Sequence, residues 1–243
     1  MLFSHSPQLL DQFPQLSVTT LSVTGVTATP DVADITRPFL KRATARLAER
    51  PESEFPEIAA WRRAFSQMGL KPTQYRCASE ALLRRFRKDG SLPSIHPLVD
   101  VCNAVSLAYA IPIAVFDLDQ VTGNLTVRHA TGTETYATFA GDTETPEAGE
   151  VIFADDSGHA HARRWTNRQS GRSAIRPATH IVLIVSEAMH DTGQHDVNNL
   201  REQLREALTL CWTVTTYRQR LGSTWLPCRS SPIPRRSILM PAS

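Results

Sequence analysis

The segment that most constrains the fold spans residues 91–119, SLPSIHPLVDVCNAVSLAYAIPIAVFDLD, which is largely apolar and carries one amide near its middle. Its apolar residues are spaced to cover most of a helix, and Pro112 ends that helix before a strand-like run over residues 113–116. Asn103 lies within the helix. Because a buried amide without hydrogen bonds costs about 1–3 kcal/mol, we expect Asn103 either to cap neighbouring backbone or to face a pocket that receives a ligand.

The cysteines and the hydropathy pattern indicate a cytoplasmic protein. The chain has 243 residues, enough to bury a sizeable core. Its 4 cysteines are far apart and form no CxxC pair, which argues against a zinc site or a disulfide framework and favours a reducing compartment. No stretch approaches the roughly 20 apolar residues of a membrane span, and the N-terminus lacks a signal-peptide pattern. We therefore expect no membrane partner.

Positive charge is concentrated locally. The net charge is only +2, which excludes a strongly basic nucleic-acid coat. However, residues 163–176 contain arginines and no acidic residue, and residues 84–88 form a second basic run. Such clusters suit phosphate groups, although the second run, at the end of an amphipathic helix, equally suits a solvated face paired with nearby acids.

The order of elements predicts an α+β fold. Helical patterns dominate the first half, and strand-and-turn patterns follow from residue 113 onward. We expect N-terminal helices packed on a mainly antiparallel sheet, with a closing C-terminal helix over residues 198–212. Three parts are predicted: an N-terminal strand and helix packing on the core (residues 1–55), the main domain with its closing helix (56–213), and an unstructured Arg/Pro-rich tail (214–243).

The sequence contains no strong enzyme motif. GxSxG, HExxH, GxGxxG and P-loop patterns are all missing. His159 and His161 have a spacing that can bind a metal, but no third ligand lies nearby in the sequence, so we predict no metal site and no cofactor.

A dense polar segment over residues 149–176 is the second candidate site. Arg164, Trp165, Asn167, Arg168 and Gln169 offer an aromatic face, guanidinium forks and amides within a few residues. This combination suits nucleotide recognition, since bases stack on aromatic rings and arginine binds phosphate. Alternatively, Trp165 is a core aromatic residue flanked by solvated charges.

Three carboxylates are candidates for orienting a hydrolytic water: Glu134, Glu150 and Asp155. Each could equally be an ion-pair partner for Arg128 or Arg164, and Asp155 could cap the turn that follows it. Arg128 is also counted among the candidate substrate-binding residues.

These stretches resemble the B3/B4 domain of the bacterial phenylalanyl-tRNA synthetase β subunit, and more closely the stand-alone B3/B4 tRNA-binding domain proteins. The resemblance covers roughly residues 56–188 and rests on AWRRAFSQMGLKPTQYRCASEALLRR, LPSIHPLVDVCNAVSLAYAIPIAVFDLD, LTVRHATGTE, GEVIFADD and RRWTNRQS. It implies an α+β domain with a cleft between helices and sheet. In the synthetase, that cleft hydrolyses tyrosine wrongly esterified to the phenylalanine tRNA.

The resemblance carries over only some of the site residues. Asp100 and Asn103 match the synthetase's VDxxN motif, but Ala114 stands at the position of its histidine. The synthetase's last-strand glutamate falls within residues 183–185, which contain no acid, and RRWTNRQS replaces its glycine-rich loop. Tyrosine-specific editing is therefore not carried over, and the resemblance implies that Arg164, Trp165, Asn167 and Arg168 serve the stand-alone proteins instead.

The leading hypothesis is a tRNA-binding protein that hydrolyses a mischarged aminoacyl-tRNA in trans. Asn103 would hold the amino acid or its ester carbonyl, Arg164 and Arg168 the terminal phosphates, and Trp165 the terminal base. The alternatives are a non-catalytic module that binds an amino acid, a nucleotide or the tRNA acceptor end, and a relic in which Asn103 only caps backbone. Aminoacylation itself is not expected, because the chain has no ATP-binding motif.

Overall fold

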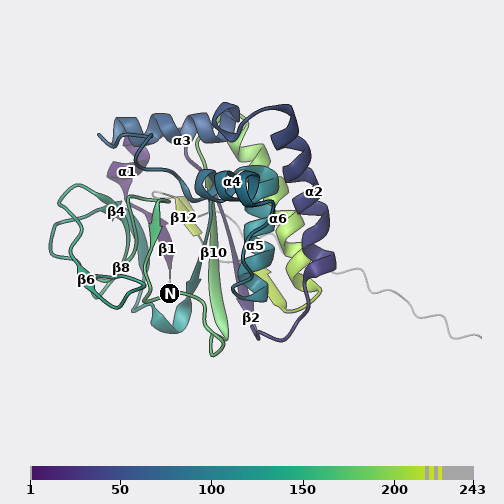
Figure 1. The fold of residues 1–243 in the computed structure, drawn as a ribbon. Coiled ribbons are helices and arrows are strands. Elements are labelled where there is room, and N and C mark those ends of the chain that lie inside the picture. The colour runs from purple at the N-terminus through teal and green to yellow at the C-terminus, as the bar shows by residue number, and fades with distance from the viewer. Residues whose placement is uncertain (1, 217–218, 222–223, 226–243) are drawn as a thin grey trace, which may run out of the picture.

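The fold is α+β, as the sequence predicts. The computed structural model describes residues 2–216, 219–221 and 224–225. Two sheets stand side by side, and helices cover the outer face of one of them (Figure 1). Most strand pairs are antiparallel.

The smaller sheet has the strand order β11-β2-β10-β3. Its interior strand β10 is the apolar run IVLIVSEA, buried along almost its whole length as expected for a central strand. The β-branched SVTTLSVT run forms β2, which pairs with β10 over all eight of its residues. The strands are β2 (Ser17–Thr24), β3 (Ile113–Asp117), β10 (Ile181–Ala188) and β11 (Thr213–Thr216).

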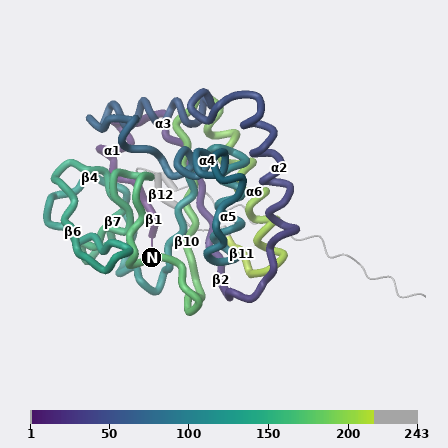
Figure 2. The backbone as a smooth tube through the Cα atoms, in the orientation of Figure 1, coloured from purple at the N-terminus to yellow at the C-terminus, as the bar shows by residue number. Residues whose placement is uncertain are grey.

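The larger sheet has the order β13-β12-β1-β4-β7-β8-β9. Its strand β1 runs parallel to both β4 and β12, so the two ends of the described chain lie beside each other in one sheet (Figure 2). A separate small ladder joins β5 (Tyr136–Ala137) to β6 (Thr143–Glu144). The large sheet comprises β1 (Phe3–His5), β4 (Leu125–His129), β7 (Val151–Asp155), β8 (Ala160–Arg163), β9 (Arg168–Gln169), β12 (Gln219–Leu221) and β13 (Thr224–Trp225).

Two hydrophobic clusters hold these layers together. One lies between the smaller sheet and the helices α2, α5 and α6, and includes Val105, Ile184 and Leu204. The other cluster brings together residues of both sheets and α3, including Phe116 and Phe153. The helices are α1 (Pro7–Gln12), α2 (Ala33–Glu49), α3 (Pro56–Gln67), α4 (Ala78–Asp89), α5 (Pro97–Tyr109) and α6 (Gly193–Thr209), with short 3-10 turns η1 (Glu52–Glu54) and η2 (Leu118–Gln120).

Three segments differ from the sequence-based expectation. The closing helix begins at Gly193 rather than at Asn198, because Val197 also packs against the sheet. Residues 1–55 do not simply pack on the core, since β1 and β2 are interior strands of the two sheets. Residues 214–216, expected at the start of the unstructured tail, form an edge strand on β2 together with Thr213, because their β-branched side chains suit a pleated surface. Residues 219–221 and 224–225 of that tail also form strands, β12 and β13, and residues 217–218, 222–223 and 226–243 lie outside the described residues.

Candidate functional site

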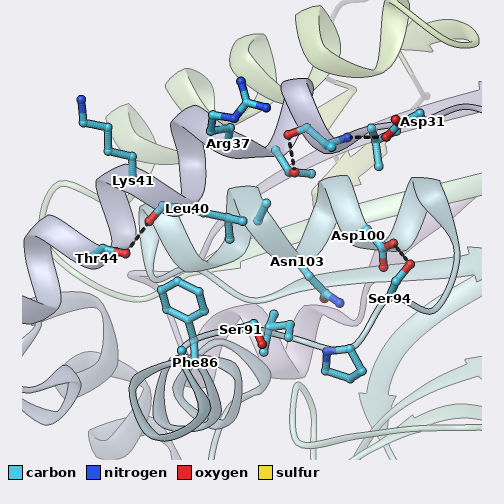
Figure 3. A pocket seen from close by; sticks show the side chains of 17 residues that line it. Asp31, Arg37, Leu40, Lys41, Thr44, Phe86, Ser91, Ser94, Asp100 and Asn103 are labelled. Atoms are coloured by element: carbon cyan, nitrogen blue, oxygen red, sulfur yellow. Dashed lines mark hydrogen bonds between the residues drawn. The ribbon is translucent and has the colours of Figure 1, made fainter.

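Asn103 faces a groove between α2, α4 and α5 (Figure 3). The groove encloses about 790 Å³, and Arg37 and Lys41 of α2 and Phe86 of α4 line it with Asn103. The Asn103 side chain is half-buried and makes no hydrogen bond to any other described residue. Of the two predicted roles, the pocket-facing one fits the geometry, because the amide caps no backbone.

Asp100 fixes the loop at one end of this groove. Its carboxylate accepts hydrogen bonds from the Ser94 hydroxyl at 2.5 Å and from the Ile95 backbone N–H at 3.0 Å. The carboxylate lies in the first turn of α5, where it also complements the helix dipole. Asp100 therefore orders the rim of the groove.

The second candidate segment forms a strained turn after β8. Arg164 has φ 47° and Trp165 has φ 58°, so two successive residues other than glycine adopt the left-handed conformation. Such conformations cost about 1–3 kcal/mol each and persist only where the surroundings enforce them. Here the Trp165 backbone N–H donates to the Val151 carbonyl at 2.7 Å, and the Arg164 backbone N–H donates to the Glu150 carboxylate at 3.1 Å.

This turn directs the Trp165 side chain into the core. Its relative exposure is 0%, and it packs edge-on against Phe13 and Trp61, with ring centroids 5.0 and 5.2 Å away. Its indole N–H donates to both carboxylate oxygens of Glu187 at 3.1 Å. The alternative of a core aromatic residue is confirmed, and stacking on a nucleotide base is contradicted because no face of the ring is exposed.

A small pocket of about 60 Å³ lies beside Trp165 and Glu187. Glu187 is buried at 2% exposure, and His5 Nε2 lies 2.6 Å from its Oε1. The Thr166 hydroxyl oxygen is also buried at this pocket and has no hydrogen-bond partner among the described residues. The other lining residues are Ala78, Pro112, Ile113, Ala114, Phe153, Ala162, Asn167, Arg168, Gln169 and Val185.

Sequence reasoning missed Glu187. The expectation that residues 183–185 lack an acid is correct, but β10 continues to Ala188 and carries the glutamate two residues beyond Val185. Because side chains two apart on a strand share a face, Val185 and Glu187 both line the pocket. Continuing the alternation of side chains along the strand two residues beyond Val185 identifies Glu187 as a side chain on the same face.

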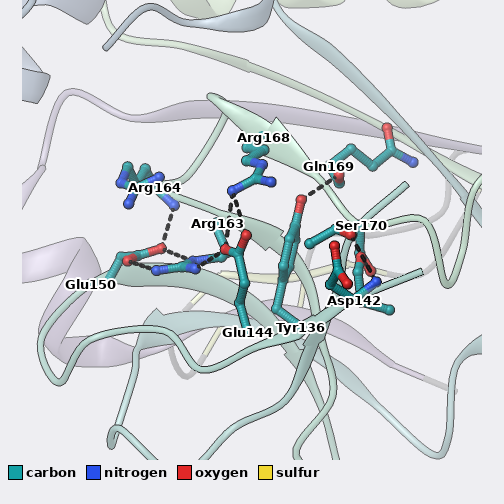
Figure 4. A network of polar contacts seen from close by, with 11 residues as sticks. Tyr136, Asp142, Glu144, Glu150, Arg163, Arg164, Arg168, Gln169 and Ser170 are labelled. Atoms are coloured by element: carbon teal, nitrogen blue, oxygen red, sulfur yellow. Dashed lines mark hydrogen bonds and ion pairs between the residues drawn. The ribbon is translucent and has the colours of Figure 1, made fainter. Parts of the chain in front are cut away.

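The remaining polar residues of the 164–169 segment have different partners, and Figure 4 shows Arg164 and Arg168 near Glu150 and Glu144. Asn167 donates to the Arg76 carbonyl at 2.7 Å, and Arg168 donates to the Glu144 carboxylate at 3.0 Å. The Arg164 guanidinium instead stacks on the Tyr75 ring, 4.8 Å from its centroid. Within the described part of the chain, no carboxylate pairs with the Arg164 side chain, which leaves its charge available to a ligand.

Glu134 is committed to a structural role. It accepts hydrogen bonds from Arg128 at 2.5 Å and from the backbone N–H groups of Thr131, Gly132 and Thr133. Burial favours the protonated form, but the Thr131 backbone and Arg128 hydrogen bonds outweigh it and lower the pKa of Glu134 to about 2. A carboxylate with so low a pKa is a weak general base at neutral pH, and its partner Arg128 is equally engaged.

Asp155 and Glu150 are engaged in the same way. Asp155 accepts from the backbone N–H groups of Thr122 and His159 and contacts the rings of His159 and His161; burial opposes these bonds, yet the pKa of Asp155 falls to about 2. Glu150 accepts two hydrogen bonds from Arg163 at 2.8 Å, which lower its pKa against the effect of burial. Among the described residues, neither these two carboxylates nor Glu134 lines the groove or the small pocket. Their predicted role in orienting water therefore does not fit the structure.

Comparison with known proteins shows the family of this chain. The model of the B3/4 domain family matches residues 60–205. The chain belongs to the B3/4 domain family. Its similarity to curated proteins covers only part of each of them: the phenylalanine–tRNA ligase β subunit of Fusobacterium nucleatum is 34% identical over 87 residues, which are 36% of this chain and 11% of that one. The β subunit of Dickeya dadantii is 29% identical over 121 residues, or 50% of this chain and 15% of its own.

A solved structure shares the fold. An N-terminal fragment of the phenylalanyl-tRNA synthetase β-subunit from Pyrococcus horikoshii superposes with a TM-score of 0.51. The match covers 93% of this chain and 53% of that fragment at 10% sequence identity, so it bears on the fold alone.

In this B3/4 domain the predicted binding residues do not converge on one cavity. Within the described residues, the Asn103 groove and the small pocket beside Glu187 share no lining residue. The described part of the domain also contains no cluster of three or more His, Cys, Asp or Glu suited to a metal ion. None of its described helices is long and apolar enough to cross a membrane.

Proposed function

We propose that this B3/4 domain protein binds the aminoacylated acceptor end of a tRNA and hydrolyses its ester in trans. Its relatives are β subunits of phenylalanine–tRNA ligases, which by their name act on tRNA. The observation that carries the proposal is a pocket with a carboxylate and an unpaired hydroxyl, Glu187 and Thr166. Two residues before Thr166 in the chain is a cation, Arg164, without a carboxylate partner among the described residues.

The RNA would bind the protein at Arg164. Guanidinium groups bind phosphate oxygens with paired N–H donors, and the Tyr75 ring holds this one in place. Arg172 and Arg176 follow in the same acid-free stretch, and Arg176 is exposed. Arg168, which the sequence suggests as a second phosphate ligand, is paired with Glu144 and is therefore a weaker candidate.

Replacing Arg164 with alanine is expected to weaken tRNA binding about tenfold and to reduce the slope of log affinity against log salt by about one, because one phosphate contact is lost. Arg168→Ala is the matched control, since it removes an arginine four residues away that already has a carboxylate partner. It should change the affinity less than twofold. Fluorescence anisotropy with labelled tRNA at several salt concentrations measures both, and equal losses in the two variants would contradict the assignment.

Ester hydrolysis would take place at the small pocket. Glu187 is the one carboxylate that lines this pocket among the described residues. A water held by Glu187 would attack the ester carbonyl and give its proton to the carboxylate, which passes it to the departing ribose oxygen. The activity is tested by incubating the protein with a panel of mischarged tRNAs and measuring free amino acid. If the amino acid is released no faster than the spontaneous rate, hydrolysis is refuted and only tRNA binding remains.

A second candidate function is favoured by the Asn103 groove. Its volume of about 790 Å³ lies within the range of small-molecule sites, about 300–1,000 Å³. An amide without a partner among the described residues faces it, and the exposed residues Arg37, which pairs with Asp34, and Lys41 lie along its edge. These groups suit a free amino acid or a nucleotide, which the protein would bind without turnover.

Asn103→Ala is expected to weaken binding of such a ligand at least tenfold while lowering the melting temperature by less than about 2 °C, since no internal hydrogen bond is lost. Calorimetric titration with adenosine monophosphate and with a set of free amino acids measures the affinity. Thr44→Ala is the control, because Thr44 lines the same groove but its hydroxyl donates to the Leu40 carbonyl. If no probe binds the unaltered protein, the groove is not a site for these ligands.

A further inference from the structure

The space beside Glu187 is small. The pocket encloses about 60 Å³, the volume that about two waters occupy in the liquid at about 30 Å³ each. A methyl or hydroxymethyl side chain has one or two non-hydrogen atoms and fits a space of this size. A tyrosyl or phenylalanyl group adds an aromatic ring, which this space cannot contain.

The Trp165 indole sets this limit, and it is firmly held. The side chain contacts Phe13 and Trp61, and its N–H donates to Glu187. The backbone N–H of the same residue bonds to the Val151 carbonyl. Moving the ring to enlarge the pocket would break these contacts together, so the pocket keeps its size when a ligand arrives.

The walls of the pocket suit a short aliphatic side chain. Ala114 of β3, Ala162 of β8 and Val185 of β10 give apolar surfaces with small side chains. A methyl group is stabilised here because its apolar surface leaves water. A longer side chain would clash with the strands, which are fixed by their neighbours in the sheets.

Two polar groups match the rest of an aminoacyl ester. The Glu187 carboxylate is the proposed base, and its Oε2 accepts only the Trp165 N–H among the described donors, so it can also hold the attacking water at the ester carbonyl. The buried Thr166 hydroxyl can donate to the ester carbonyl. Buried polar atoms are rarely left unpaired, so a ligand that bonds to Thr166 removes an energetic cost of the empty pocket.

We infer, building on the proposed function, that this pocket accepts an aminoacyl group with a side chain no larger than that of alanine or serine and excludes tyrosyl and phenylalanyl groups. The substrate class is thus a tRNA carrying a small amino acid. The fold is shared with a synthetase fragment, but the selectivity follows from the indole that fills this chain's own pocket.

Stable analogues test this selectivity. Titration calorimetry of the full chain with 3′-alanylamino-3′-deoxyadenosine and its tyrosyl counterpart compares the two groups without hydrolysis. The alanyl analogue is expected to bind at least tenfold more tightly. Equal or tighter binding of the tyrosyl analogue, or no binding of either, would overturn the inference. Binding of uncharged tRNA, measured in parallel, tests the proposed function separately, because its absence would refute tRNA recognition and leave the analogue ratio intact.

A filled pocket gives an independent check. Ala114→Ile adds three carbon atoms to a strand residue that lines the pocket, and isoleucine suits a strand. Affinity for the alanyl analogue should fall at least tenfold, and tRNA affinity should change less than twofold. Circular dichroism establishes that the variant is folded. Unchanged analogue binding by the folded variant would show that the analogue binds elsewhere.

Discussion

Replacing Trp165 with alanine is expected to lower the free energy of unfolding by about 3–5 kcal/mol, the usual cost of deleting a buried large aromatic side chain. The indole has 0% exposure and packs against Phe13 and Trp61, so the variant loses these contacts and leaves a cavity. Glu187 also loses its indole donor. Urea unfolding followed by circular dichroism measures the change.

The same variant should gain affinity for an aromatic aminoacyl group. Removing the indole joins its volume to the small pocket, and we expect the tyrosyl analogue to bind Trp165→Ala at least tenfold more tightly than it binds the unaltered protein. Trp61→Ala is the matched control, because Trp61 is equally buried and touches Trp165 but does not line the pocket. It should lose similar stability and gain no tyrosyl binding. An equal gain in tyrosyl affinity in both variants would mean that the ligand enters because the fold is less stable, and not because the indole has been removed from the pocket.

The elements of the fold could largely be predicted, because their signals are local. The apolar spacing and Pro112 predict α5 and β3 within a few residues of their observed bounds, and the continuous apolar run predicts β10 as a central strand. The pairing of the strands could not be predicted in this way. Phe3–His5 is too short to show a period, yet it joins β4 and β12, strands far away in the sequence.

The candidate site was predicted less well, because roles there depend on backbone conformation and on distant partners. The sequence suggests that Trp165 is available for stacking, but the left-handed turn at Arg164 and Trp165 directs the indole inward. The partners of Glu150, residues 163 and 164, are brought close only by the pairing of β7 with β8. For Asn103, its isolation in an apolar helix left a backbone cap and a pocket-facing amide both open, and only the packing of α2 and α4 beside α5 decides between them.

Glu187→Gln is expected to slow deacylation by about 100-fold or more, the usual contribution of a general base. Glutamine has the same shape, so its amide oxygen can still accept the Trp165 indole N–H and keep the pocket walls in place. An amide does not take a proton from water near neutral pH. We therefore expect the rate of the chemical step to fall and the tRNA affinity to stay the same. Single-turnover deacylation of alanyl-tRNA, with tRNA affinity measured beside it, separates the rate from binding.

Glu150→Gln distinguishes the chemical role from a structural one. Glu150 is also a buried carboxylate that holds the 163–165 turn, but it does not line the pocket. Its substitution leaves the buried Arg163 with a weaker partner, so we expect a loss of stability with a deacylation rate, measured well below the unfolding temperature, within about threefold of the original. A Glu187→Gln variant that retains its rate would exclude this carboxylate as the base, and a similar loss of rate in both variants would show that Glu187 acts through the fold instead.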